Sequence, residues 1–516
     1  MNPIRLVSGV FTVGLWTMLS RVLGLARDII ILAVLGTGPV YEAFVVAFRL
    51  PNMFRRFFAE GAFNMAFVPI FSKKLEADDG PQRFMNEAFA GLATLLIALT
   101  VLAQVAMPWL ILGLASGFAG DEQYPLAVAF GRIAFPYILF ISLAALLSGV
   151  LNAAGRFAAA AAAPVLLNVL FVGTALLAEP LGLELGYALV WAIPVAGVAQ
   201  LALLWIAAAR AGFHVRPAWP RLTPDLKRLV RIAIPAALAG GVVQVNLLVG
   251  QQVASYFDRA VGWLFTADRL YQLPLGVVGI AIGIVLLPDL SRRLKAEDAA
   301  GSRNALSRAG ELALALTLPC AVALVVIPRP IVSVLFERGA ARPEDSAAIA
   351  LAVAVYGAGL PAFVLQKVLQ PLYFAREDTR RPFNYALLAM VANAAVAIGL
   401  APVIGWIACA LATTLAGWVM LAALVAGTGR MGEVARFDDR FRRRAPRIFL
   451  ASLIMGAALW PAKLLLAPWL SADYIRYPAL ALLIAIGCAV YFGAGPLIGA
   501  FRLSDFTGAV KRRKSG

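Results

Sequence analysis

The chain has 516 residues, of which 62% are hydrophobic and 14% charged, and its mean hydropathy is +0.84. A chain this apolar lacks the polar side chains needed to cover a soluble globule, so its composition excludes a soluble enzyme or binding protein and indicates a polytopic membrane protein. The formal net charge of +17 is carried by short blocks between apolar windows. That distribution argues against a nucleic-acid-binding protein.

Apolar windows predict roughly fourteen membrane-spanning helices, each near the ~20 residues needed to cross the hydrocarbon. Their approximate limits are residues 8–36, 41–72, 84–115, 124–152, 157–178, 185–209, 229–257, 262–291, 305–328, 346–375, 383–400, 403–427, 446–468 and 477–501. The first window is long, contains arginines and lacks a small-residue cleavage site. We therefore expect it to remain in the membrane.

Loop charges predict the orientation of the chain. Loops after even-numbered spans carry clusters of basic residues, such as Lys73 with Lys74, and Arg380 with Arg381. Loops after odd-numbered spans carry acids instead. By the positive-inside rule both termini then lie in the cytoplasm, including the basic tail at 503–516.

A short internal repeat predicts two related halves. The segment beginning at Pro69 recurs at Pro288, and the segment around Pro108 recurs at Pro328, with nearly the same offset. An even number of spans in each half makes the repeats parallel. We predict an N-lobe at 1–212 with six helices, a C-lobe at 222–428 with six, and two further helices at 446–502.

Eight ionisable residues lie inside the first two predicted spans. They are Arg21, Arg27, Asp28, Glu42, Arg49, Arg55, Arg56 and Glu60. A charge facing lipid costs roughly 3 kcal/mol, so eight would cost roughly 24 kcal/mol, more than the ~5–15 kcal/mol that stabilises a typical fold. They must face protein or water. Because five arginines outnumber three acids, we predict a cavity that binds an anion.

In the first span Arg21 and Asp28 share a helical face, whereas Arg27 lies about 120° away. Both arginines reach one cavity only if the helix bends, and Gly24 between them allows a bend. The alternative is that Arg27 and Asp28 extend to the membrane interface.

The second span contains Pro51, which we expect to interrupt the helix and so mark a substrate path. Arg56 and Glu60 have i, i+4 spacing, so they are candidates either for a structural or gating ion pair or for direct ligand contact. Arg55 has no partner at that spacing and is the better ligand candidate.

The second half repeats a charge before a proline, with Asp268 and Arg269 preceding Pro274. We expect Arg269 to face the first-half arginines, and guanidinium groups suit the oxygens of a pyrophosphate. The alternative is that Asp268 pairs with a neighbouring helix for stability.

Sites for other chemistry are absent from the sequence. There is no Walker A loop or dinucleotide fingerprint, so we expect no cofactor and coupling to the membrane potential or to an ion or substrate gradient. His214 is the single histidine, and Cys320, Cys409 and Cys488 lack metal-ligand spacing, so we predict no metal site. Nor do we predict an enzyme, because the carboxylates lie beside arginines that lower their basicity.

At these motifs the chain resembles the MurJ (MviN) family of lipid II flippases, in the superfamily that also contains MATE multidrug exporters and polysaccharide flippases. The motifs are Ser20 to Asp28, Phe48 to Asn52 with Arg55 and Arg56, Phe58 to Phe63, and Ala267 to Leu270 with Pro274. The resemblance runs nearly end to end. It implies fourteen transmembrane helices, with two six-helix lobes around a central cationic cavity and an apolar lipid-tail groove formed by spans 13 and 14.

The resemblance also implies a substrate and its site residues. The substrate would be lipid II, whose pyrophosphate binds Arg21, Arg27, Arg55 and Arg269. Gating or charge-compensating roles would fall to Asp28, Glu42, Arg49, Arg56, Glu60, Asp268 and Gln272. Glu42 stands where the family often has aspartate, and Gln272 where some relatives have glutamate. Because Asn384 and Asn393 lack a nearby aspartate in their span, we do not predict bound sodium.

These features together predict a monomer in the bacterial inner membrane that contacts membrane lipids and flips lipid II by alternating access. Acids such as Asp28, Glu42 and Glu60 would compete for the arginines during release. The alternative is a multidrug or polysaccharide-precursor exporter. A cation-exporting cavity should be acidic or aromatic rather than rich in arginine.

Overall fold

The computed structural model describes residues 3–55, 63–216, 219–221, 223–432, 435–502 and 505. These residues form helices and connecting turns, with no strand among them, which confirms the predicted all-α fold. Arg56, Glu60 and most of the basic tail lie outside the described residues.

Ten of the helices within the described ranges are long and apolar enough to cross a membrane. Their outer surfaces are apolar. On α4 (Pro81–Leu114), Val105 and Trp109 are 67% and 68% exposed. Such surfaces are expected to face lipid, because apolar area of this extent is unfavourable in water. The chain is therefore a multi-pass membrane protein, and the count of fourteen spans stays a prediction.

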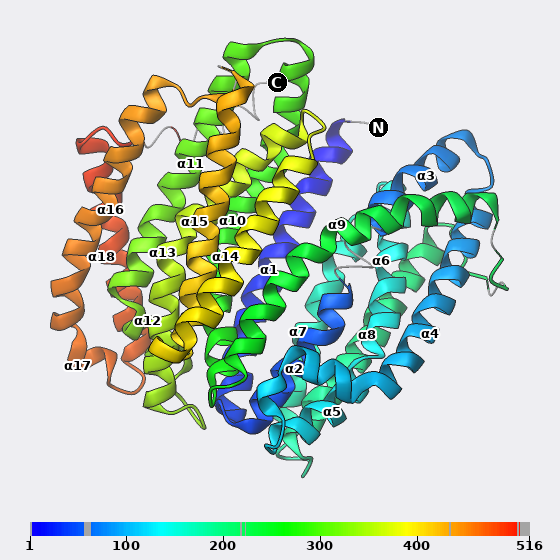
Figure 1. Cartoon of the computed structure of the whole chain (residues 1–516), viewed down its shortest axis with the longest axis horizontal. Helices are drawn as coiled ribbons and strands as arrows, with labels where there is room; N and C mark the ends of the chain where they lie inside the picture. The colour runs from blue at the N-terminus through cyan, green and yellow to red at the C-terminus, as the bar shows by residue number, and fades with distance from the viewer. Residues whose placement is uncertain are drawn as a thin grey trace. The chain divides into compact units, whose positions relative to one another are not determined.

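The chain divides into two compact units, the first of which contains Met1–Gly262 and Arg338–Ala341. Its other helices are α1 (Pro3–Leu35), α2 (Pro39–Arg55), α3 (Phe63–Ala77), η2 (Ser116–Phe118), α5 (Gln123–Ala134), α6 (Tyr137–Ala153), α7 (Ala158–Leu177), α8 (Leu185–Arg210) and α9 (Pro224–Ala254). Helix α8 packs beside both α6 and α7 (Figure 1).

Two segments of the first unit come from beyond the predicted N-lobe at 1–212. Helix α9 packs on α3 and α4. The turn at Arg338–Ala341 reaches the end of α1, where Ala340 N donates to Ala33 O at 2.7 Å. A Cβ on Gly339 would lie 2.1 Å from Ala33 O, so only glycine permits this approach.

The second unit contains Trp263–Glu337 and Arg342–Gly516. Its helices are α10 (Ala260–Lys295, whose first residues belong to the first unit), α11 (Ala299–Val326), α12 (Pro328–Phe336), α13 (Pro343–Phe374), α14 (Arg380–Ile404), α15 (Ile407–Thr428), η3 (Gly429–Met431), α16 (Asp439–Leu465), α17 (Ala467–Leu470) and α18 (Arg476–Leu497).

Helices α16 and α18 lie side by side (Figure 1) and bury an apolar cluster against α11 and α12. Two cations hold the end of this helix pair where α16 finishes and α18 begins. Lys463 Nζ donates to Val326 O at 3.0 Å, and Arg476 Nη1 donates to Glu337 O at 3.0 Å. These carbonyls close the C-terminal ends of α11 and α12, where a positive charge is favourable.

The predicted interruption at Pro51 is wrong, because α2 continues through it to Arg55. Proline removes only one N–H donor from a helix. The following residue adds a compensating bond, since Asn52 Nδ2 donates to Phe48 O at 2.9 Å. Helix α2 is also largely buried between Tyr41 and Pro51, so packing stabilises it.

Candidate functional site

Arg27 and Asp28 form a buried ion pair on α1, with 7% and 8% of their surfaces exposed. Arg27 Nη2 lies 2.7 Å from Asp28 Oδ1, and Nε donates to the same oxygen at 2.9 Å. Consecutive residues point about 100° apart on a helix, so the long arginine side chain folds back onto its neighbour. The Asp28 carboxylate thus neutralises Arg27 in this structure.

Arg27 also donates a hydrogen bond to α7. Arg27 Nη1 donates to Asn168 Oδ1 at 3.0 Å, and Asn168 Nδ2 donates to Ser20 O at 2.9 Å. The guanidinium carbon lies 5.8 Å from the Phe48 ring and 5.5 Å from the Phe171 ring. Two aromatic faces and an amide therefore fix Arg27 in place.

Arg21 differs from Arg27, because its guanidinium forms no hydrogen bond or ion pair with the residues that the structure describes. Its Nε is buried without a partner, while the residue as a whole is only half-buried. A guanidinium has five donors and no acceptor. Arg21 is therefore the candidate whose donors are available to an incoming anion.

Glu42 lies in the first turn of α2 and is 1% exposed. Its carboxylate accepts from Val261 N at 3.2 Å. An acid is favourable at this position because the N-terminal end of a helix carries partial positive charge. The charge-compensating role expected for Glu42 stays a prediction.

Arg49 and Arg55 occupy later positions of α2. Arg49 Nη1 donates to Gln251 Oε1 on α9 at 2.5 Å. Arg55 is the last residue of α2, where the partial negative charge of the helix end favours a cation. Both are half-buried.

The second-half candidates lie on α10, in the second unit. The Arg269 guanidinium carbon is 4.5 Å from the Phe265 ring, one helical turn earlier. Gln272 Nε2 donates to Asp268 Oδ2. The Asp268 side chain is thus engaged along its own helix, and Gln272 is its partner.

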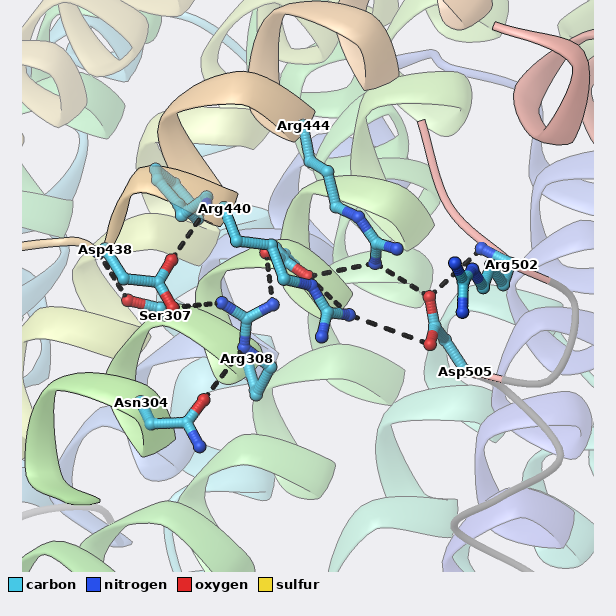
Figure 2. Close-up of polar contacts among 10 residues, drawn as sticks. Asn304, Ser307, Arg308, Asp438, Arg440, Arg444, Arg502 and Asp505 are labelled. Carbon is cyan, nitrogen blue, oxygen red and sulfur yellow. Dashed lines mark hydrogen bonds and ion pairs between the residues drawn. The ribbon is translucent and has the colours of Figure 1, made fainter. Parts of the chain in front are cut away.

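A second polar cluster, which the sequence did not predict, joins α11, the start of α16 and the segment after α18 (Figure 2). Glu311 lies within 3.3 Å of three arginines: Arg308, Arg440 and Arg444. Arg444 also contacts Asp505 at 2.8 Å, and Arg308 contacts Asp438. Three cations balance three acids, so this cluster fastens helices together and leaves little net charge for a ligand.

The two aspartates of this cluster have pKa values below their ordinary range. For each, burial alone would raise the pKa, but hydrogen bonds and the arginines outweigh it. Asp438 accepts from Phe441 N and faces Arg308. Asp505 accepts from Arg502 N and faces Arg444.

Sequence reasoning missed Asn168 and Gln251, which hold two of the predicted arginines. Asn168 carried one signal, since it is the one amide side chain, with no charged residue beside it, in the apolar window at 157–178. Among the described residues, no group of three or more His, Cys, Asp or Glu side chains is placed to hold a metal ion.

Known proteins resemble this chain over most of its length. The family model for "Lipid II flippase MurJ" matches residues 31–479. A probable lipid II flippase of Rhizobium meliloti (strain 1021) is 45% identical over 99% of this chain and 97% of its own length. The corresponding protein of Rickettsia prowazekii (strain Madrid E) is 32% identical over 93% of this chain and 96% of its own length.

Solved structures share the fold. A lipid II flippase in an inward closed conformation matches with a TM-score of 0.79 at 24% identity, covering 96% of this chain and 99% of that chain. An inward-facing MATE multidrug transporter matches with a TM-score of 0.68 at 15% identity, covering 80% and 95%. The predicted architecture of a flippase or MATE transporter is therefore confirmed at the level of the fold.

Proposed function

The chain belongs to the MurJ family of lipid II flippases, and from that premise we propose that it moves lipid II from the cytoplasmic to the outer leaflet by alternating access. It acts as a transporter in the bacterial inner membrane, with both termini in the cytoplasm. The substrate keeps its covalent structure throughout. Transport draws on the membrane potential or on an ion or substrate gradient, and the protein acts as a monomer.

We propose that the pyrophosphate binds Arg21, Arg27, Arg55 and Arg269. The observation that carries this assignment is the contrast within α1, where Arg21 has unused donors and Arg27 is neutralised by Asp28. An anion meets Arg21 first, because binding there breaks no existing ion pair. Arg27 joins when the phosphate replaces Asp28, since phosphate oxygens accept the same charge-assisted bonds.

Release reverses that exchange. Asp28 lies next to Arg27 in the chain and recaptures it as the headgroup leaves, which lowers the affinity of the site for the anion. Glu42 and Glu60 supply further negative charge. The exporter alternative is less favoured, because donor-only guanidinium groups repel the cations that many drugs carry.

The test is transfer of labelled lipid II across the bilayer of vesicles that contain the full chain. We expect the triple variant Arg21→Ala, Arg27→Ala and Arg269→Ala to lose transfer and lipid II affinity. Arg83→Ala is the matched control, because the Arg83 side chain is 82% exposed and, among the described residues, pairs with Glu87 along its own helix. Unchanged lipid II affinity in the triple variant would overturn the arginine assignment. Chemically altered lipid would overturn transport.

A further inference from the structure

Two consecutive glutamines near the end of α9 have different environments. Gln252 uses its whole amide: Nε2 donates to Leu112 O at 3.3 Å and to Ser116 Oγ at 2.5 Å, and Oε1 accepts from Ser116 N at 3.2 Å. These bonds fasten the end of α9 to α4 and η2. Gln252 is thus a fully satisfied structural residue.

Gln251 uses only half of its amide. It is 3% exposed, and its Oε1 accepts from Arg49 Nη1 at 2.5 Å. A guanidinium can only donate, so the amide oxygen must face Arg49 and the NH2 group must face away. That Nε2 is buried and has no acceptor among the described residues.

An unsatisfied buried donor costs free energy, and such groups are uncommon in folded proteins. An apolar side chain of similar size would avoid this cost. The adjacent Gln252 shows that this end of α9 can satisfy an amide completely. The free donor on Gln251 therefore points to an acceptor that a ligand supplies.

We propose that Gln251 binds the headgroup of the transported lipid together with Arg49, a role that rests on the proposed function. Its oxygen orients the Arg49 guanidinium, and its amide nitrogen donates to an anionic oxygen of the headgroup. Arg49 is partly exposed, whereas the Gln251 nitrogen is covered. The anion meets the guanidinium first and reaches the amide nitrogen second.

The chemistry of the pair limits the ligand. A cation and an N–H donor together favour a phosphate or carboxylate oxygen over a neutral or cationic group. In lipid II that oxygen belongs either to the pyrophosphate or to a carboxylate of the peptide. Both sources share the same chemistry, so the experiment must separate them.

The decisive variant is Gln251→Glu, which keeps an oxygen for Arg49 but removes both N–H donors. Gln251→Met removes the oxygen as well. We expect Gln251→Glu to raise the dissociation constant for lipid II by about tenfold or more, which corresponds to losing one hydrogen bond to a charged group. Its thermal midpoint should stay at or above that of the unmodified chain, because the contact with Arg49 becomes an ion pair. A purely structural glutamine would not separate affinity from stability in this way.

Gln252→Glu is the matched control, one position along the same helix. It loses the donors to Leu112 and Ser116, so we expect a lower thermal midpoint, with lipid II affinity retained in the folded fraction. Measuring undecaprenyl diphosphate beside lipid II identifies the source of the oxygen. Equal losses for both lipids assign the pyrophosphate, and a loss confined to lipid II assigns the remainder of the headgroup.

Failure of this inference is distinct from failure of the proposed function. If the unmodified chain does not bind lipid II, the proposed function is wrong. If it binds lipid II and both Gln251 variants bind it equally well, then Gln251 is structural and the inference is overturned.

Discussion

The paired charges of α1 show how a membrane protein accommodates arginine at low exposure. Arg27 has a carboxylate, an amide and two aromatic rings around it. Sequence alone indicated that Arg27 and Asp28 must avoid lipid. It did not identify Asn168, because that bond joins residues 141 positions apart and no local pattern encodes it.

Removing one member of the pair should destabilise the protein more than removing both. We expect Asp28→Leu to cost about 3–5 kcal/mol of unfolding free energy, because a buried guanidinium is left uncompensated. The double variant Arg27→Met with Asp28→Leu should cost less than the Asp28 variant alone. Unfolding midpoints in detergent measure both, and a double variant at least as destabilised as Asp28→Leu would contradict this account.

Gly117 marks a place where the end of α9 meets backbone directly. A Cβ there would lie 2.4 Å from Ser255 C and O, and Gly117 N donates to Ser255 Oγ at 3.0 Å. We expect Gly117→Val to destabilise the fold by about 1–3 kcal/mol or more through overpacking. Gly113→Ala on α4 is the control, since no heavy atom lies within 4 Å of its Cβ position. Equal thermal midpoints for the two variants would refute the close approach.

At the scale of elements, apolar windows predicted where helices lie but not where they break. The predicted span at 185–209 corresponds closely to α8 (Leu185–Arg210). The predicted span at 124–152 corresponds to one candidate membrane span, Gln123–Ala153, which divides into α5 and α6 at Phe135–Pro136. Hydropathy indicates which segments are apolar enough to lie in lipid. It does not indicate a turn at a proline within a continuously apolar window.

The cluster at the start of α16 should respond to acid. Both Asp438 and Asp505 have lowered pKa values in the folded chain, so their contribution to stability is present above the ordinary aspartate pKa of about 3.9 and is lost as the pH falls through and below it. We expect the first turns of α16 to lose protection against hydrogen exchange, relative to the intrinsic rate at each pH, below about pH 4.

The double variant Asp438→Asn with Asp505→Asn is the reference for that measurement. In this variant the first turns of α16 should be less protected against exchange at neutral pH, and that protection should change little on acidification. Asp439→Asn is the matched control, because Asp439 is exposed and forms no ion pair with the residues that the structure describes. Unaltered exchange in the double variant would show that Asp438 and Asp505 do not hold α16.

For the whole molecule, the short repeat predicted two related halves, at 1–212 and 222–428, and that duplication stays a prediction. The two compact units of the chain are divided at other positions. The predicted second half began at residue 222, whereas α9 packs within the first unit. The bonds of Ser116 and Gly117 with α9 explain this placement. They join residues more than 130 positions apart, so hydropathy could not indicate them.

Orientation can be tested on the intact chain in cells. In a background with Cys320, Cys409 and Cys488 replaced by alanine, we expect Asp79→Cys to resist a membrane-impermeant thiol reagent applied from outside, and Gly182→Cys to react. The physical reason is the excess of basic residues in the loops assigned to the cytoplasm. Labelling of the first position with protection of the second would reverse the predicted topology.

Lys463 and Arg476 hold one end of the α16 and α18 pair against the ends of α11 and α12, and the Glu311 cluster holds the other end of α16 against α11. We therefore expect these two helices to move together with the rest of the second unit. A long hydrocarbon chain resting on them would be carried along with it during every turnover. Movement of the lipid tail would then need no energy source beyond the one that moves the second unit.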